Sequence, residues 1–376
     1  HDQGGLVYER KLTPNDDLTV LGYVGQRQVV QFLGLQGLTP ANSSGGVVDL
    51  DRVFGGVGLR WTHRLQLASA PATFTAGIDY DNMEERRKGF VNNNGVAGAL
   101  KRNEDDQVFN LDPYLQLEWQ LAQRWLLTAG IRHNRVKFES KDYFIGGTNP
   151  DDSGSIQYTS TNPAAGVLFK LTPTINLYAN AGRGFETPTF AELAYRPGGG
   201  TGLNFDLKPA KSRSFEIGVK AFLNDNVRVN AALFRIDTRN EIVVLTNVGG
   251  RSTYQNASGT RRDGFELSLD GRWNNGVTLA VAYSYLDAAY RDSFLTCGAP
   301  PCAAPIILVP AGNRLPGAPK STLYTELGWK YVPLGFSTAL EARWVDRIFV
   351  NDQNSEATDR YAVANLRLGF EQRAGA

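Results

Sequence analysis

The sequence has little of what an enzyme site usually needs. Its 376 residues include one methionine, two cysteines and three histidines. No Ser-x-x-Lys or Gly-x-Ser-x-Gly motif is present, which argues against a serine hydrolase. His63 and His133 each lie two residues from an apolar residue and would share its face in an extended strand. We therefore interpret both as residues of an apolar–polar interface. We therefore expect no enzyme activity, no catalytic residue, no cofactor and no bound metal.

Long apolar runs and an excess of one charge are also missing. No run approaches the roughly 18 residues of a membrane helix. The net charge is +1, so nucleic acid is not expected as a partner. Hydrophobic residues make up 42% and charged residues 20%, a balance too apolar for a disordered chain. The 40 glycines and the 11% aromatic content suit many strands joined by turns.

Period-two alternation of apolar and polar residues runs through most of the chain. In VTLAVAYSY (residues 277–285) and STLYTELGWKY (residues 321–331), apolar side chains share one face and small or polar side chains the other. Such alternation predicts half-buried strands. We count about 15 of them, most of roughly 8 to 12 residues, which is the length that crosses a bilayer when tilted.

The connections between these strands alternate in length. Short turns are expected at TPND, APA, LAQR, TPT, LNDN, NNG and VPLG. Long connections are expected near residues 27–56, 81–112, 138–162, 184–212, 239–262, 288–320 and 347–359. This alternation is typical of an all-β fold, the transmembrane antiparallel up-and-down β-barrel, with turns on one rim and loops on the other.

Five of the six tryptophans lie at or near the expected short turns: Trp61, Trp119, Trp125, Trp273 and Trp329. Trp344 lies toward a long connection. Tryptophan concentrates where the apolar membrane meets water, so the five are interpreted as an aromatic girdle at the rim of short turns. Core tryptophans of a soluble β-protein are the alternative.

Charged residues also occur inside the predicted strands, opposite apolar partners. Glu118, Glu266, Asp270 and Glu341 are examples. A charge that faces lipid near the midplane costs roughly 2–4 kcal/mol, so these side chains are expected to face a wet lumen or a plug. Glu216 and Arg183 are expected to point inward as well. The barrel is therefore predicted to be wide, with polar contents.

Five segments, in order, resemble signature segments of TonB-dependent outer-membrane receptors. They are GRGFETPTFAEL (182–193), LKPAKSRSFEIGVK (207–220), ALFRIDTRNEIV (232–243), NASGTRRDGFELSL (256–269) and NRLPGAPKSTLYTEL (313–327). Together they cover most of residues 175–330. In the first segment, Gly182 and Gly184 lack the third glycine of a dinucleotide motif, and Pro188 ends the strand ladder, so a phosphate-binding loop is disfavoured.

The resemblance implies a 22-stranded barrel, an N-terminal plug domain and a TonB box. The sequence shows neither plug nor TonB box, and its end, GFEQRAGA, does not close on an aromatic residue. An open sheet edge is not viable in lipid. We therefore expect residues 1–376 to be part of a receptor barrel, without the plug domain and the C-terminal closing strands.

The resemblance also implies a function in the bacterial outer membrane. Such a receptor binds a scarce ferric siderophore and imports it with energy from TonB, which acts through the plug region, and works as a monomer among outer-membrane lipid and lipopolysaccharide. A receptor for another chelate (cobalamin, copper or a citrate-type chelate) and a passive porin are the alternatives. Arginine and tyrosine suit an anionic or aromatic chelate. From loop placement, the predicted ligand-binding residues are Arg27, Gln28, Arg86, Arg87, Tyr195, Arg196, Arg251 and Tyr254.

Three further features belong to the predicted loops. Cys297 and Cys302 are expected to form a disulfide within one extracellular loop, with two free thiols as the alternative. The acidic run NEDDQ (103–107) is expected to be a solvated loop, with Ca²⁺ binding as the alternative. EERRK (84–88) is likewise expected to be a solvated loop that could attract an anionic ferric chelate or lipopolysaccharide phosphates.

Overall fold

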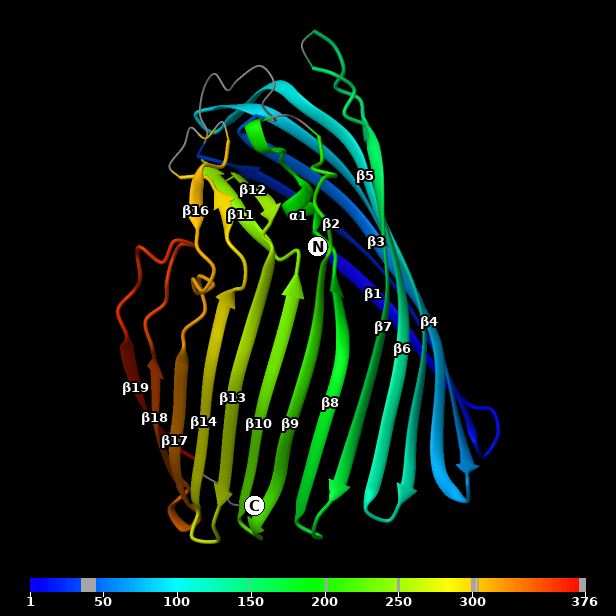
Figure 1. Ribbon diagram of the computed structural model, residues 1–376, viewed down its shortest axis with the longest axis vertical. Coiled ribbons are helices and arrows are strands. Elements are labelled where there is room, and N and C mark those ends of the chain that lie inside the picture. The colour runs from blue at the N-terminus through cyan, green and yellow to red at the C-terminus, as the bar shows by residue number, and fades with distance from the viewer. Residues whose placement is uncertain are drawn as a thin grey trace.

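A computed structural model describes residues 1–34, 45–147, 149–199, 202–248, 251–298, 302 and 304–371. Fifteen strands form one antiparallel sheet in which hydrogen-bonded neighbours follow chain order, and they lie side by side as a curved wall (Figure 1). The all-β, antiparallel, up-and-down fold and the expected number of strands are confirmed. The outermost strands, β1 and β19, are not paired with each other in the described part of the chain.

The strands of the main sheet are β1 (Asp2–Lys11), β2 (Asp16–Phe32), β3 (Val47–Leu67), β4 (Ala70–Asn93), β5 (Val96–Ala122), β6 (Trp125–Asp142), β7 (Gly154–Lys170), β8 (Ile175–Glu186), β9 (Ala210–Asn224), β10 (Val227–Arg239), β13 (Gly259–Arg272), β14 (Val277–Tyr290), β17 (Ser321–Tyr331), β18 (Phe336–Val345) and β19 (Tyr361–Phe370). Two small hairpins are formed by β11 (Ile242–Val248) with β12 (Arg251–Asn256) and by β15 (Phe294–Thr296) with β16 (Ile307–Val309). The helical pieces are α1 (Phe190–Leu193), η1 (Pro197–Gly199) and η2 (Val332–Leu334). No helix in these described ranges is long and apolar enough to cross a membrane.

The connections divide between the two ends of the wall, as expected. Short turns gather at one end, the short-turn rim, and the two hairpins and the longer connections lie at the other, the long-loop rim (Figure 1). Two of the expected long loops are wrong in extent. Residues 81–112 belong mainly to β4 and β5, which meet in a turn at Asn94 and Gly95, both with positive φ (51° and 89°). Most described residues of 27–56 lie in β2 and β3.

The polar runs EERRK and NEDDQ were therefore wrongly expected to be loops. Their residues pair directly across β4 and β5, from Glu84 with Gln107 to Lys88 with Asn103. Side chains alternate between the two faces of a strand, so a run of charges can put half of its members into a polar interior. A run without apolar residues carries no signal that separates this arrangement from a solvated loop.

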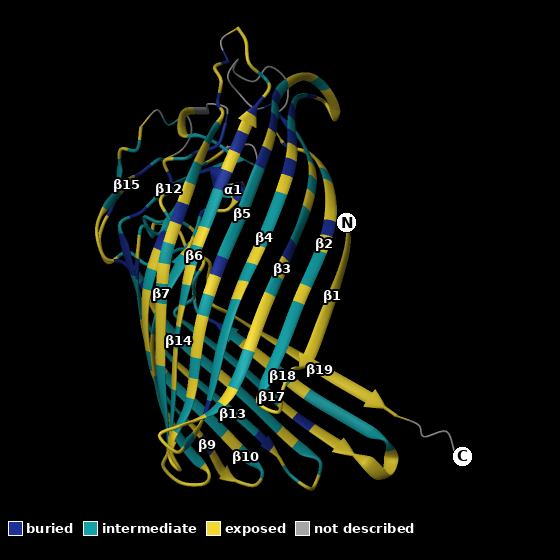
Figure 2. Ribbon diagram, turned by 90° about the vertical axis from the view of Figure 1, so that its right-hand side faces the viewer, coloured by how far each residue is buried: buried dark blue, intermediate teal, exposed yellow. Residues whose placement is uncertain are grey.

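The outer face of the wall carries a band of exposed apolar side chains. Members of the band on successive strands are Val57, Leu59, Ile78, Leu115, Ile131, Phe215, Ile217, Leu233, Leu327 and Leu340. Toward the long-loop rim the outward side chains become polar after Tyr80 and Phe109, whose rings are 6.4 Å apart. A continuous apolar band of this kind is typical of a wall that faces lipid. In Figure 2 most buried positions of β3–β6 lie above it, near the long-loop rim.

The inner face is polar, as predicted from the charges inside strands. Glu118 lines one hollow on this face, and Glu266 and Glu341 line another. Glu216 faces the same way, since it pairs in register with Asn180 of the first hollow. Arg183 was wrongly expected to point inward. It lies three residues after Asn180, and strand alternation places it on the outer face.

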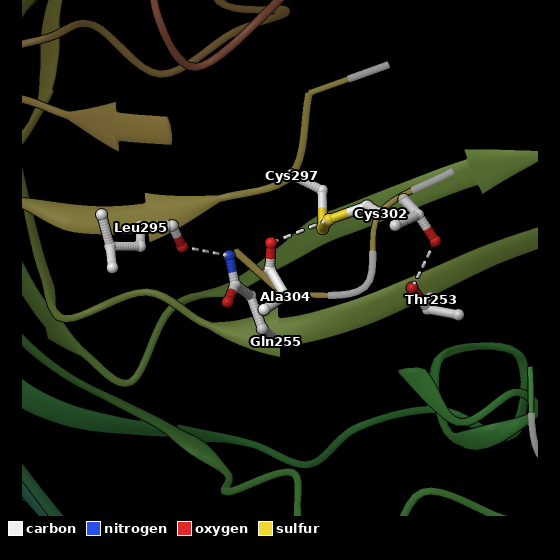
Figure 3. Close-up of a disulfide and its surroundings, with 7 residues drawn as sticks. Thr253, Gln255, Leu295, Cys297, Cys302 and Ala304 are labelled. Carbon is white, nitrogen blue, oxygen red and sulfur yellow. Dashed lines mark hydrogen bonds between the residues drawn. A yellow bond between two sulfur atoms is a disulfide. The ribbon is translucent and has the colours of Figure 1, made fainter. Parts of the chain in front are cut away.

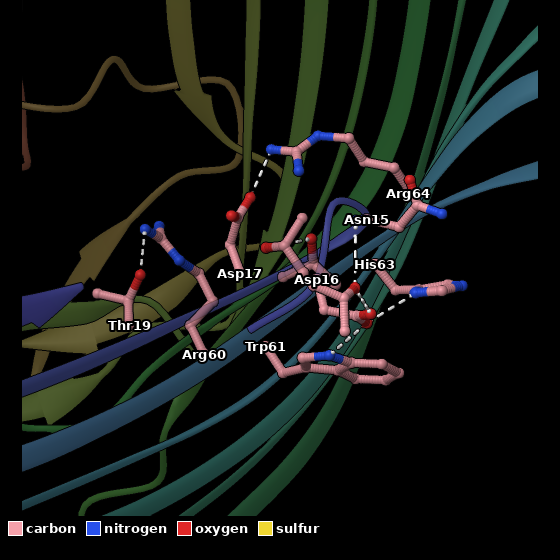
Figure 4. Close-up of polar contacts among 11 residues, drawn as sticks. Asn15, Asp16, Asp17, Thr19, Arg60, Trp61, His63 and Arg64 are labelled. Carbon is pink, nitrogen blue, oxygen red and sulfur yellow. Dashed lines mark hydrogen bonds and ion pairs between the residues drawn. The ribbon is translucent and has the colours of Figure 1, made fainter. Parts of the chain in front are cut away.

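The aromatic girdle is confirmed at the short-turn rim. Three indole nitrogens donate hydrogen bonds there: Trp61 to Asp16 Oδ1 (3.0 Å), Trp119 to the Leu67 carbonyl (3.1 Å) and Trp329 to the Asn275 carbonyl (3.3 Å). His63 Nδ1 lies 2.8 Å from the same Asp16 oxygen, beside the Trp61 ring (Figure 4). The rings thus keep an apolar body and a satisfied polar edge, as an interfacial position requires.

The assignment of the two faces predicts that two lysine substitutions on β9 differ in their effect on the free energy of unfolding. Ile217→Lys places a charge in the outer apolar band and should lower the free energy of unfolding by about 2–4 kcal/mol. Ser214→Lys introduces the same charge on the inner face, three residues away, and should leave it nearly unchanged. Urea unfolding of the barrel in lipid vesicles measures both. Equal losses for the two variants would contradict the assignment.

Candidate functional site

The described residues between β8 and β9, 187–199 and 202–209, fold against the inner face of the wall, and we call them the inner segment. Pro188 is buried just after β8 ends, and Thr189 then caps α1. The Thr189 side chain accepts a hydrogen bond from the Glu192 backbone N–H, while the Glu192 carboxylate accepts one from the Thr189 N–H. This reciprocal capping explains how the chain can leave a strand and form a helical turn within three residues.

An apolar cluster holds the inner segment in place. Its buried members from the segment are Phe190, Leu193, Leu203 and Leu207, and those from the wall are Phe138 and Tyr158. The Tyr158 hydroxyl donates a 2.7 Å hydrogen bond to the Leu207 carbonyl. Burial of several large apolar side chains contributes about 1.5–3 kcal/mol for each, so the segment is a firmly packed part of the inner face.

Tyr195 lies at the centre of the candidate site. Its ring is contacted by two guanidinium groups, Arg87 of β4 at 5.4 Å and Arg251 of β12 at 5.0 Å from the ring centroid. The three residues come from distant parts of the sequence, and Tyr195 follows Leu193 of the apolar cluster by two residues. Cation–π contacts of this length attract each guanidinium to the ring face.

Arg102 connects the inner segment to β5. Its Nη1 donates a 2.7 Å hydrogen bond to the Ala194 carbonyl, next to Tyr195, and its Nη2 lies 2.6 Å from Glu104 Oε2. Both side chains of this ion pair are almost fully buried. Removing one partner of such a pair leaves an uncompensated buried charge, which costs about 3–5 kcal/mol.

The electrostatic environment of Arg87 and Arg251 favours the binding of an anion beside them. These side chains lie beyond the outer apolar band, since outward neighbours such as Asp105 are polar. Burial first, and the Arg102 charge second, lower the pKa of Arg87. Burial also lowers the pKa of Arg251. A bound anion would offset the cost that both positive charges bear here. Among the residues the structure describes, no group of three or more His, Cys, Asp or Glu side chains could hold a metal ion.

The structure separates the eight predicted ligand residues into groups. Arg87, Tyr195 and Arg251 meet in one site. Arg196 is held beside them by Asp152 Oδ1 at 2.9 Å and by the Leu203 carbonyl at 3.0 Å.

The remaining four lie farther from the centre. Tyr254 packs on the apolar cluster. Arg27 lies on the inner face, in register with Arg52. Arg86 and Gln28 lie on the outer face, where Arg86 Nε is 3.6 Å from Asp105 Oδ1. Whether any of the eight binds a ligand stays a prediction.

Sequence reasoning missed Arg102, Glu104 and Asp106 as members of the site. They lie at every second position of β5 and are buried on the inner face. Burial first, and the neighbouring Glu104 carboxylate second, raise the pKa of Asp106 to about 7. Residues 102–106 are all polar, so the sequence carries no alternation that could have revealed them, and only the pairing with Glu85 and Arg87 of β4 does so.

The predicted disulfide between Cys297 and Cys302 is confirmed, with a Cα–Cα distance of 5.8 Å (Figure 3). It joins the end of β15 to the chain that leads into β16. The Gln255 side chain of β12 donates a 3.0 Å hydrogen bond to the Leu295 carbonyl of β15, so the two hairpins are in contact. The bond closes a very short loop, and its effect is local shape rather than global stability.

These features agree with the family that the chain matches. The family model "TonB dependent receptor-like, beta-barrel" matches residues 1–374. The chain belongs to this family of TonB-dependent receptor β-barrels.

The similarity to individual proteins covers only part of this chain and part of each relative. The chain is 27% identical over 277 residues to the probable TonB-dependent siderophore receptor PiuA of Acinetobacter baumannii, covering 68% of this chain and 34% of PiuA. It is 31% identical over 180 residues to the metal-pseudopaline receptor CntO of Pseudomonas aeruginosa, covering 46% of this chain and 23% of CntO. The chain thus spans about a third or less of these relatives.

Solved structures show the same fold. The siderophore receptor PiuA of Acinetobacter baumannii superposes with a TM-score of 0.75 at 18% identity, covering 97% of this chain and 57% of that one. The ferric citrate transporter FecA superposes with a TM-score of 0.76 at 16% identity, covering 99% of this chain and 54% of FecA. The copper transporter OprC superposes with a TM-score of 0.73 at 17% identity, covering 97% of this chain and 55% of OprC.

The raised pKa of Asp106 predicts a pH dependence of stability. Between the ordinary value of 3.8 and about 7, the folded carboxyl holds a proton that the unfolded chain has released. The free energy of unfolding should therefore fall as the pH rises through this window. Asp106→Asn should remove most of that slope.

Urea unfolding in detergent at several pH values across the window measures this slope. The neighbouring Asp105→Asn, on the exposed outer face, is the matched control and should keep the wild-type slope. An unchanged slope in Asp106→Asn would contradict the prediction.

Proposed function

We propose that this chain is the barrel part of a bacterial outer-membrane receptor that binds a ferric siderophore at the long-loop rim. TonB supplies the energy for import through a plug region, so the protein is a transporter and not an enzyme. The observation that carries the proposal is the position of Tyr195 between Arg87 and Arg251 on the inner face. The family, and the siderophore receptor named among its relatives, support the same reading.

The chemistry of the site suits such a ligand. Ferric chelates are polar, often anionic and often built on aromatic groups. Guanidinium groups bind carboxylate and catecholate oxygens through charge-assisted hydrogen bonds, and they stack on aromatic rings. Arg87 and Arg251 are held by the Tyr195 ring and the packed inner segment, so little conformational freedom is lost when a ligand binds.

A different metal chelate is the second candidate. The relative with 31% identity is named a metal-pseudopaline receptor, and a copper transporter and vitamin B12 transporters are also similar to this chain. The arginines recognise the anionic groups of a chelator rather than the metal itself. The test therefore has to vary the metal as well as the chelator.

Growth of iron-limited cells that carry the full-length gene tests the proposal. At least one ferric siderophore from a panel should restore growth, and only when TonB is present. Panels of copper, nickel, zinc and cobalamin ligands are run in parallel. Rescue by another chelate alone would favour the second candidate. Uptake that persists without TonB and without the proton-motive force would indicate a passive porin and overturn the proposal.

Two substitutions test the site within the full-length receptor. Tyr195→Ala and Arg251→Gln should each weaken binding of the transported chelate by about 2 kcal/mol, roughly thirtyfold, as expected for a half-buried anchor at the centre of a site. Arg86→Gln, on the outer face one residue from Arg87, is the control and should bind like the wild type. Fluorescence quenching or calorimetry on purified receptor gives the dissociation constants. Wild-type affinity in both test variants would place the ligand elsewhere.

A further inference from the structure

Strand β7 has a neighbouring strand on both sides along only half of its length. It pairs with β6 from Gly154 onward without a register shift, whereas its pairing with β8 starts only at Ala164. Toward the long-loop rim β7 diverges from β8 (Figure 1). Residues 155–163 of β7 thus have a paired strand on the β6 side alone, and we call them the β7 edge.

Hydrogen bonds at the other end of β7 show which backbone groups the β7 edge leaves open. The Lys170 N–H donates to the Arg124 carbonyl on the β6 side, at 2.8 Å. The Leu171 N–H donates to the Ile175 carbonyl on the β8 side, at 2.9 Å. Backbone groups of successive residues point to opposite sides of a strand, and the register with β6 is unbroken, so the odd-numbered residues point toward β8.

The odd-numbered residues of the β7 edge that carry an N–H are Ser155, Gln157, Thr159 and Thr161. In the part of the chain that the structure describes, no backbone hydrogen bond joins them to a residue on the β8 side. Each of them therefore presents a donor and an acceptor to the space beside β7.

The sequence of the β7 edge does not protect it against pairing. Proteins usually blunt a free strand edge with charged residues, proline or a bulge. Residues 154–162, GSIQYTSTN, contain no charged residue and no proline, and no bulge interrupts this part of β7. Ile156, Thr159 and Thr161 are β-branched and favour the extended conformation. The β7 edge is therefore suited to accept a further strand.

A groove of about 750 Å³ lies beside the β7 edge. Residues 159–162 of β7 line one side of it, and the ends of β8, β9 and β10 line the other. Five cations belong to the lining, Arg183, Lys211, Arg213, Arg239 and Arg291, against the two carboxylates of Asp237 and Asp292. Asp237 Oδ1 already accepts from Arg261 at 2.8 Å and from Arg291 at 3.3 Å. The groove thus carries a surplus of positive charge.

The register of the sheet concentrates this charge on the outer face. Arg183 lies directly opposite Arg213, and Lys211 lies directly opposite Arg239. Asp237 lies opposite Arg213 on its other side and offsets part of the charge. Like charges in directly opposed positions destabilise an antiparallel pair. Acidic side chains placed in the groove would relieve this repulsion.

We propose that the β7 edge and the adjoining groove bind an extended, acidic segment of a partner polypeptide, which adds to β7 as a further strand. In strand addition the main-chain hydrogen bonds supply affinity and alternate side chains supply specificity. Every second side chain of the added strand faces the outer, cationic side, so acidic residues at alternate positions match the groove.

Other occupants use this surface less completely. A free anion accepts from the N–H groups of the β7 edge but leaves its carbonyls without a donor. A second copy of this chain, paired edge to edge, would bring two cationic grooves together, and such like-charge contacts are unfavourable. An acidic extended segment satisfies both the backbone groups and the charge.

The inference goes beyond the proposed transport function and does not depend on which chelate is carried. It uses the proposed outer-membrane location only for the side from which the partner approaches, since the long-loop rim of such barrels faces the cell exterior. The proposed chelate site lies on the inner face around Tyr195, whereas the groove lies on the outer face. Tyr195→Ala should therefore bind the partner segment like the wild type.

Binding of labelled synthetic peptides to the full-length receptor in detergent, followed by fluorescence anisotropy at low ionic strength, tests the inference. The probe is a peptide of about eight residues, enough to span the β7 edge, in which glutamate alternates with threonine. A matched peptide has lysine in place of glutamate. The wild type should bind the acidic peptide about tenfold or more tightly than the lysine peptide.

Hydrogen–deuterium exchange on the same samples reports the backbone directly. The amides of Gln157, Thr159 and Thr161 should exchange rapidly in the free receptor, because they have no partner on the β8 side. The acidic peptide should slow their exchange about tenfold or more, as expected for amides that enter a strand ladder.

Two substitutions at one position separate backbone recognition from side-chain recognition. Thr159→Pro removes one N–H of the β7 edge, and its ring obstructs an approaching strand, so the acidic peptide should bind about tenfold more weakly. Thr159→Val keeps the N–H and the branched shape, and should bind like the wild type.

A second pair of variants tests the charge. Arg183→Gln/Arg239→Gln should reduce the preference for the acidic peptide over the lysine peptide about tenfold. Arg86→Gln/Lys88→Gln removes the same charge from the outer face of β4 and should retain the preference.

Equal affinity of the wild type for the two peptides would overturn the inference, as would wild-type affinity in Thr159→Pro. Slow amide exchange of the β7 edge in the free receptor would overturn it too, because a second copy or another part of the receptor would then already cover the edge. The peptide comparison and the exchange measurement use only the wild type, so they stay decisive if a variant does not fold.

Discussion

The antiparallel register of the sheet is the constraint on which the rest of this structure depends. A lipid-facing wall offers its backbone no outside hydrogen-bond partners, so each strand must be bonded along its length to its neighbours. Alternation then assigns every side chain to one of two solvents, lipid outside or a polar interior. A slip by one residue would exchange the two faces of a strand, so the apolar band itself holds the register in place.

The inner segment turns one end of this wall into a site. Strand β8 ends at Glu186, and the capped turn of α1 places Phe190 and Leu193 against the wall. This packing brings Tyr195 between two arginines from other strands. The buried pair of Arg102 and Glu104 fixes the segment through a backbone carbonyl, an arrangement that depends on complete pairing because each charge alone would be strongly unfavourable.

The same alternation places neighbouring residues of one strand in two different environments. On β4, Arg87 faces the proposed chelate site and Arg86 faces outward with Asp105 as its partner. On β8 and β9, the outward cations Arg183, Lys211 and Arg213 gather where the apolar band ends, and Asp237 of β10 lies directly opposite Arg213. Side chains of the same type therefore face the polar interior and the outside of the wall, separated only by its thickness.

The sequence by itself determined the fold class, the girdle and the polar inner face, because these follow from period-two alternation and from where tryptophans lie relative to short turns. It also identified Cys297 and Cys302 as a pair, and Arg87, Tyr195 and Arg251 as candidates. Only the tertiary structure decided which candidates meet, since strands far apart in the chain contribute to one site. It also decided that residues 84–88 and 103–107 are paired strands and that Arg183 faces outward. A short polar run looks the same in a loop and in a strand, and its environment is set by the neighbouring strands.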